Sequence, residues 1–239
     1  MADSRRKILI TGATSGIGLA LARRLVDRHD VLVAARKTPQ EAKALLPDGC
    51  AYVQADFSEP AAASQVIASH LLKAGWTKLD NVVINAGVGF VTDDGCDTPA
   101  RVRQTLDINL TASILLARAL YPWLQKASGT LTLVGSVAHK GQAMFPAYAA
   151  SKAGLHGFAR ALRSEWAGRV AVQIIHPGPT RTDMHQKAGF DPGKMADFFL
   201  KPDSVALMME RAIASKRSPV TCSFARLAGG GTIVGRSLS

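Results

Sequence analysis

The stretch KILITGATSGIGLALARRL, residues 7–25, decides the fold of this chain. Its first five residues are mostly apolar and predict a short buried strand. Its last residues repeat apolar side chains at the spacing of an amphipathic helix. The turn between them has the spacing GxxxGxG, which differs from the GxGxxG fingerprint of dinucleotide sites. Glycines there let the backbone approach a phosphate, and the helix start offers free N–H groups, so a dinucleotide site is favoured over a purely structural turn.

Beyond this stretch, apolar strand-like runs alternate with helical patterns to the end of the chain. That alternation predicts an α/β fold in a single domain, a doubly wound parallel sheet of about seven strands with helices on both faces. We expect residues 1–224 to form the domain, including a substrate lid at 180–200, and residues 225–239 to form a Gly-rich tail. Strands are expected at 7–11, 31–35, 51–55, 79–84, 130–135, 170–175 and 219–224, and helices at 38–46, 61–73, 99–126, 146–166 and 202–215.

Composition narrows the class of protein. The chain has 239 residues, of which 47% are hydrophobic and 20% charged, as in soluble globular proteins. No apolar run approaches the ~20 residues of a membrane span, so no membrane partner is expected. Cys50, Cys96 and Cys222 lie far apart without metal-ligand spacing, which predicts reduced thiols, no metal and a cytoplasmic protein.

The formal net charge is +11, and most of the excess lies in the second half of the chain. Solubility explains such a charge, and so does attraction of an anionic cofactor, an anionic substrate or an acidic carrier protein. Charge alone also suits nucleic acid, but the chain lacks zinc spacing, interleaved aromatic and basic residues, and a basic tail. We therefore expect no nucleic-acid partner.

A second informative stretch is SVAHKGQAMFPAYAASK, residues 136–152. Tyr148 and Lys152 are four residues apart and share one face if this stretch is helical. An ammonium group beside a phenol favours the phenolate and lowers the phenol pKa from about 10. The Ser136 hydroxyl would hold a carbonyl oxygen next to the phenol. These groups would move a proton to a carbonyl or from an alcohol, although a half-buried Tyr with a snorkelling Lys is the alternative if they stand alone.

Several polar residues and small turns directly follow the expected strands. Strand 31–35 ends at Arg36 and Lys37, where an NAD-binding unit usually has an acid for the ribose 2′-hydroxyl. These cations suit a 2′-phosphate, which predicts NADP(H) rather than NAD(H). Asp56 would accept from an adenine amino group or cap the next helix. Since the carboxyl ends of parallel strands share one edge, these residues are expected to meet there.

These residues resemble those of the short-chain dehydrogenase/reductase family over roughly residues 7 to 215. The resemblance is carried by TGATSGIG at 11–18, Asp56, NAG at 85–87, Asn109, Ser136, YAASK at 148–152 and PG at 177–178. Each motif alone is weak, but their order and spacing are specific. The resemblance implies a Rossmann-type domain and hydride transfer between a nicotinamide cofactor and a carbonyl or alcohol. Two departures, Ile84 before NAG and His176 before PG, are tolerable.

Family roles carry over residue by residue. The resemblance implies that Tyr148 is the general acid or base, that Lys152 lowers its pKa and binds the nicotinamide ribose, that Ser136 polarises the carbonyl, and that Asn109 anchors a relay water. Arg36 resembles the basic residue of NADP-preferring members, whereas Ser15 stands where some of them carry a second one. The implied cofactor-binding set is Gly12, Thr14, Ser15, Gly16, Ile17, Gly18, Arg36, Lys37, Asp56, Phe57, Asn85, Ala86, Gly87, Tyr148, Lys152, Pro177 and Gly178.

Three functions remain open on the sequence. The first is an NADP(H)-dependent oxidoreductase acting on a small carbonyl or alcohol. The second is a non-catalytic NADP(H)-binding regulator or scaffold of the same fold, and the third is a 3-oxoacyl-carrier-type reductase that docks its carrier on the basic half. The resemblance also implies a homo-oligomer, a dimer or tetramer, through helices 99–126 and 146–166. Met184, Met195, Phe198 and Phe199 are candidate walls of the substrate pocket.

Overall fold

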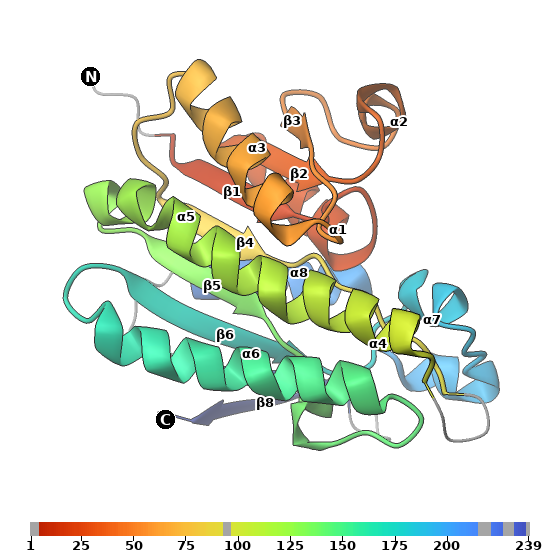
Figure 1. The fold of residues 1–239 in the computed structure, drawn as a ribbon. Helices are drawn as coiled ribbons and strands as arrows, with labels where there is room; N and C mark the ends of the chain where they lie inside the picture. Colours follow the sequence, from red (N-terminus) through yellow and green to blue (C-terminus); the bar gives the residue numbers. More distant parts are fainter. Residues whose placement is uncertain (1–4, 93–96, 215–220, 227–231, 238–239) are drawn as a thin grey trace.

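A computed structural model of the chain describes residues 5–92, 97–214, 221–226 and 232–237, with the side chains of Met195 and of the last two strands outside the description. Its elements follow the alternation expected from the sequence (Figure 1). They are β1 (Lys7–Thr11), α1 (Gly16–Leu25), β2 (Asp30–Ala35), α2 (Pro39–Lys43), β3 (Ala51–Gln54), α3 (Pro60–Lys73), β4 (Asn81–Ile84), α4 (Pro99–Leu106), η1 (Asp107–Thr111), α5 (Ala112–Ala127), β5 (Thr130–Val134), η2 (Val137–Lys140), α6 (Pro146–Glu165), β6 (Ala171–Pro177), α7 (Met184–Lys187), η3 (Gly193–Phe198), α8 (Pro202–Ala214), β7 (Thr221–Arg226) and β8 (Thr232–Ser237).

Six parallel strands, in the order β3-β2-β1-β4-β5-β6, form the body of the sheet. Beyond β6 the sheet continues with β7, parallel to β6, and ends at β8, antiparallel to β7. The α/β fold with helices on both faces is confirmed. With β7 and β8 the sheet has eight strands among the described residues, of which seven are parallel, against an expected parallel sheet of about seven. The expected Gly-rich tail is corrected, because residues 232–237 form a strand and the proposed boundary at 224 falls inside β7.

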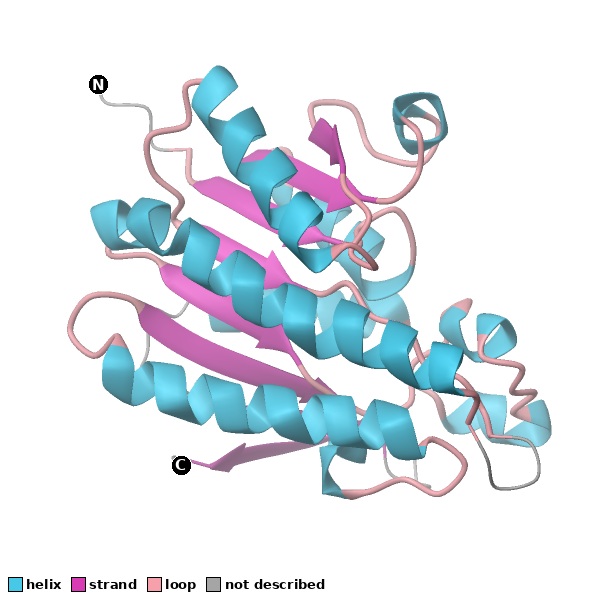
Figure 2. Ribbon diagram, viewed as in Figure 1, coloured by secondary structure: helices cyan, strands magenta, loops and turns pink. Residues whose placement is uncertain are grey.

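The helices cover the sheet in two layers. Figures 1 and 2 show α3, α5 and α6 side by side on the face toward the viewer, with α1 and α8 behind the strands. Each layer buries its own apolar cluster because alternate strand residues point to opposite faces. Leu9 packs with Ile67, Leu116 and Leu155 on one face, whereas Ile8 and Ile10 pack with α1 and α8 on the other.

The chain reverses its direction across the sheet between β1 and β4. It first builds β1, β2 and β3 outward to one side and then returns to place β4, β5 and β6 on the other. In open α/β sheets, ligands bind at the carboxyl ends of the strands where this reversal occurs. The turns after β1 and β4 are therefore the place to look for a site.

Candidate active site

The turn after β1 is packed tightly against the turn after β4. Asn85 donates from Nδ2 to the carbonyl oxygens of Thr11 (3.0 Å) and Gly12 (3.2 Å), and the Thr11 hydroxyl accepts from the backbone N–H groups of Asn85 and Ala86. Gly12 has φ +67°, and a Cβ there would lie 2.7 Å from Cα of Ala86. Both conformation and space therefore require glycine at position 12.

The N-terminus of α1 presents backbone donors rather than a side-chain cap. Ser15 is the N-cap residue in extended conformation, but its side chain makes no capping hydrogen bond, and the first turn of α1 contains no acid. The first N–H groups of a helix have no partner within the helix, and the positive end of its dipole favours an anion. Thr14, Gly16, Ile17 and Gly18 form this turn, so the residues present fit a dinucleotide pyrophosphate.

Arg36 and Lys37 follow β2, the strand next to β1. Arg36 is exposed, and its guanidinium makes no hydrogen bond or ion pair with any side chain that the structure describes. Lys37 differs, because its ammonium lies 3.8 Å from the carboxylate of Glu41. Arg36 is thus the better placed of the two cations for a phosphate arriving at the strand ends.

Asp56 and Phe57 follow β3. Oδ1 of Asp56 accepts from both the backbone N–H and the hydroxyl of Ser58, at 3.0 and 2.8 Å. It therefore stabilises its own turn, whereas Glu59 occupies the N-cap position of α3. The Phe57 ring belongs to the buried core. The expected contacts of these two residues with adenine stay predictions.

Ser136 and Tyr148 lie together at the carboxyl end of β5. Ser136 is the second residue after β5, and its hydroxyl accepts from the Ala138 N–H at 3.2 Å. It lies near enough to Tyr148, in the first turn of α6, to affect the pKa of the phenol. Gly89 provides space for the Tyr148 ring, since a Cβ there would lie 3.2 Å from it. Burial raises the pKa of Tyr148, and the neighbouring Ser136 hydroxyl lowers it in part. For the protein chain alone, the expectation of a lowered Tyr148 pKa is thus wrong.

Lys152 is buried beside Tyr148. Its ammonium nitrogen donates to the carbonyl oxygen of Val134 at 2.9 Å and lies 5.6 Å from the centroid of the Tyr148 ring. The residue is only 4% exposed, and burial lowers the pKa of its amine to about 8. The amine is therefore mostly protonated at neutral pH and loses its charge as the pH rises through about 8. A Cβ on Gly87 would lie 3.5 Å from the same nitrogen, so Lys152 reaches the turn after β4.

Asn109 lies in η1, a π-helical turn between α4 and α5. Its side chain is fully committed: Oδ1 accepts from Val88 N–H, and Nδ2 donates to Val88 oxygen and to the Ser151 hydroxyl, at 2.8, 2.8 and 3.0 Å. Ser151 in turn donates to the Tyr148 carbonyl at 2.7 Å. Asn109 therefore fastens the loop after β4 to the helix that carries Tyr148. Its predicted role as anchor of a relay water is untested.

His176 is a neighbour of the site that sequence reasoning treated only as a tolerable departure. The side chain of this last-but-one residue of β6 is completely buried, with Nδ1 within 3.1 Å of the Ser136 N–H and 2.9 Å of the Ser136 oxygen. Burial, with the neighbouring histidines, lowers the pKa of His176 to about 3. It is therefore a neutral ring that positions the Ser136 backbone. Histidine at a buried strand end was the signal that could have revealed it.

The segment that follows β6 packs beside both the glycine turn and the Tyr148 region. Buried Pro177 and Gly178 lead to Thr182, whose methyl group would lie 3.1 Å from a Cβ on Gly16. Farther on, Phe190 meets Phe145 edge-on at 5.8 Å, and Phe145 meets the Tyr148 ring at 6.3 Å. Neither phenylalanine was among the residues predicted to line the pocket. Of the expected walls, Phe198 is exposed, Phe199 is buried, and the side chain of Met195 lies outside the described residues.

The sequence of the chain is similar to those of known proteins. Residues 6–192 match the family model described as short chain dehydrogenase. An uncharacterized oxidoreductase of Mycobacterium tuberculosis is 34% identical over 77% of this chain and 77% of its own length. A 3-dehydrosphinganine reductase of Arabidopsis thaliana is 30% identical over 92% of this chain and 70% of its own length.

A solved structure resembles the chain in the same way. A short chain dehydrogenase from Burkholderia cenocepacia in complex with NADP is 27% identical, covers 90% of this chain and 95% of its own, and superimposes with a TM-score of 0.77. Within the described residues, no helix combines the length and hydropathy needed to cross a bilayer.

Proposed function

This chain belongs to the short chain dehydrogenase family, and from that premise we propose that it is an NADP(H)-dependent oxidoreductase that interconverts a carbonyl group and an alcohol. The carrying observation is the meeting of Ser136, Tyr148 and Lys152 at the carboxyl end of β5, where the Lys152 ammonium donates to the Val134 carbonyl and lies 5.6 Å from the Tyr148 ring centroid. The NADP-bound relative from Burkholderia cenocepacia supports the choice of cofactor, together with exposed Arg36 after β2.

The residues divide the work as follows. The N-terminus of α1 and Arg36 bind the phosphates, and the turn Asn85–Gly87 lines the channel. When bound, NADP(H) supplies or accepts the hydride. Ser136 donates its hydroxyl hydrogen to the substrate oxygen and holds it beside the phenol. Tyr148, protonated at neutral pH because burial raises its pKa, delivers its proton to that oxygen in reduction and takes it back in oxidation.

The substrate pocket is assigned to the side of Tyr148 where Phe145 and Phe190 meet. Aromatic walls favour a substrate whose carbonyl carries an apolar group. Phe190 belongs to the segment 180–200, which supports the lid proposed there, since loops that follow strand ends often cover active sites.

We also propose a cytoplasmic homo-oligomer. Cys50 is a partly buried free thiol, and burial raises its pKa to about 11, as suits an inert reduced cysteine. The outer faces of α5 and α6 carry exposed Leu115 and an ion pair between Arg118 and Glu165, and they are the surface offered to a second copy. Light scattering on the purified protein should give the mass of a dimer or tetramer, and a monomer would contradict this part of the proposal.

The central experiment joins a binding measurement to a rate measurement. Fluorescence titration should show tighter binding of NADPH than of NADH, and Tyr148→Phe should retain that affinity. The same variant should lose at least ~100-fold in turnover of an aromatic ketone, as expected for removal of an acid–base group. Full activity in Tyr148→Phe would refute the mechanism, whereas binding of neither nucleotide would favour a scaffold without enzymatic function.

A further inference from the structure

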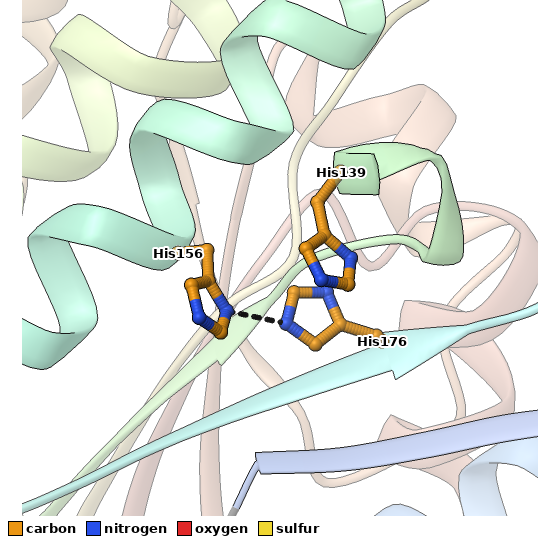
Figure 3. A group of neighbouring side chains, drawn as sticks. All are labelled: His139, His156 and His176. Carbon is orange, nitrogen blue, oxygen red and sulfur yellow. Dashed lines mark hydrogen bonds between the residues drawn. The ribbon is translucent and has the colours of Figure 1, made fainter. Parts of the chain in front are cut away.

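Three histidines from three separate elements meet beside Ser136. His139 comes from η2, His156 from α6 and His176 from β6, and one ring nitrogen of each lies within 4.8 Å of the others (Figure 3). Nδ1 of His156 is 3.0 Å from Nε2 of His176, and the His139 ring stacks on the His176 ring with centroids 3.9 Å apart. Nothing in the proposed reaction uses these three rings as a group.

The hydrogen bonds around the cluster prepare its nitrogens for a ligand. Nδ1 of His139 and Nδ1 of His176 lie 2.8 and 2.9 Å from the same acceptor, the carbonyl oxygen of Ser136. The Ser136 N–H also lies 3.1 Å from Nδ1 of His176 and donates to it in the other tautomer, so a metal on this ring requires the tautomer in which Nδ1 carries the hydrogen. When each Nδ1 donates to the Ser136 oxygen, the Nε2 atom of the same ring carries a lone pair. A metal-bound histidine typically donates its other N–H to a carbonyl or carboxylate in this way. Ser136 would therefore act as a shared support for two ligands.

The contact between His156 and His176 is also close to what a metal requires. Zinc binds imidazole nitrogen at about 2.0–2.1 Å, which places two ligands of a tetrahedral site roughly 3.3 Å apart. The observed separation of 3.0 Å needs only a small opening, with the metal in place of the shared proton. His139 is partly exposed on a short turn, so its ring can leave the stack and supply the third nitrogen.

The surroundings select the type of ion. Among the described residues, the cluster contains histidine alone, without an Asp, Glu or Cys, and Arg160 and Arg163 act on His156 from the same helix. Mg²⁺ and Ca²⁺ need oxygen ligands and negative charge, which this place lacks. Imidazole instead suits Zn²⁺, Ni²⁺ and Cu²⁺.

We propose that His139, His156 and His176 form a binding site for one transition-metal ion of the Zn²⁺, Ni²⁺ and Cu²⁺ class. The expectation of no metal came from cysteine spacing, and histidines that are distant in sequence and meet only in the fold give no spacing to find. The ion would cross-link η2, α6 and β6, the elements around Ser136, Tyr148 and Lys152. It would thereby hold the Ser136 carbonyl in one orientation without entering the cofactor edge.

The test is metal binding by the whole chain after removal of metal with a chelator. Isothermal titration with Zn²⁺ should give one ion per chain, and Co²⁺ should give visible absorption bands typical of nitrogen ligands. His139→Gln and His156→Gln should each weaken Zn²⁺ binding by more than about 100-fold, since loss of even an outer-shell partner costs 10–100-fold. His70→Gln, on the outer part of α3, is the matched control and should bind like the original chain.

Thermal unfolding provides a second readout. Because a ligand of the folded state alone stabilises it, Zn²⁺ should raise the unfolding midpoint of the original chain and of His70→Gln, but not that of His156→Gln. Circular dichroism checks that each variant is folded before titration. Failure of the folded original chain to bind Zn²⁺, Ni²⁺ or Cu²⁺ would overturn the proposal. So would equal binding by the cluster variants, or a thiolate-to-cobalt charge-transfer band that places the ion on cysteine.

Discussion

Lys152 is the residue whose chemistry departs most from that of a free side chain. Burial lowers the pKa of its amine from 10.5 to about 8, so its positive charge disappears as the pH rises through that value. Tyr148 shifts the other way and stays protonated. We predict that kcat/KM for ketone reduction is constant below about pH 8 and falls above it. A pH profile of initial rates tests this. A profile that stays level to pH 10 would show that the rate does not depend on the charge of Lys152.

The proposed preference for NADPH over NADH depends on Arg36. Its exposed guanidinium has no side-chain partner in the described structure, and a charged hydrogen bond to a 2′-phosphate is worth about 1.5–3 kcal/mol. Arg36→Glu should therefore weaken NADPH binding about 10- to 100-fold and leave NADH nearly unchanged. Lys43→Glu makes the same change of charge at the end of α2 and serves as the control. Equal losses for both nucleotides would remove Arg36 from the specificity argument.

At the scale of elements, the carboxyl ends of β5 and β6 are held together by a buried ring. His176 lies so close to β5 that a Cβ on Gly135 would be 2.4 Å from its Nδ1. We predict that Gly135→Ala lowers the free energy of unfolding by about 1–3 kcal/mol, as forced packing does. Gly157→Ala is the control, because nothing lies within 4 Å of a Cβ there and α6 would gain about 0.5–1 kcal/mol. Denaturant unfolding measures the free energy of unfolding of both variants. Equal stabilities would show that the His176 ring moves aside at no cost.

Some elements of the fold could be predicted from the local sequence pattern, and others could not. Two local features were predictable, because hydrophobic periodicity and turn chemistry determine them. They are the strand, glycine turn and helix at residues 7–25, and the position of Tyr148 one helical turn before Lys152. The π-helical turn around Asn109 was not predictable, since it follows from the partners of one side chain, Val88 and Ser151, which are distant in sequence.

The parts of the site that depend on tertiary contact were missed for the same reason. The pKa of Tyr148 depends on burial and on where the Lys152 amine points, and neither follows from a spacing of four. Phe145 and Phe190 become neighbours only through the path of the segment after β6. β8 was missed because a Gly-rich sequence hid its pairing with β7.

For the whole molecule, the net charge of +11 allows a test between a free ketone and a carrier-bound substrate. A basic surface that docks an acidic carrier is screened as the Debye length falls from about 30 Å at 0.01 M salt to about 3 Å at 1 M. For the small-ketone reductase proposed above, we predict that the KM of an apolar ketone changes less than about 2-fold over this range. A steep rise of KM for an acyl-carrier substrate, with poor turnover of free ketones, would favour the carrier instead.

The reversal of chain direction between β1 and β4 has a consequence for how the protein acquires its structure. The bond from Asn85 N–H to the Thr11 hydroxyl closes a loop of 74 residues, whereas β1 and β2 meet across a single helix. Long-range contacts form late, because loop-closure entropy opposes them. The contact expected to form last between the two halves of the sheet therefore lies at the proposed nucleotide site. A nucleotide bound there would contact both turns and hold the two halves of the sheet together. Without it, this late-forming contact would be the first to open.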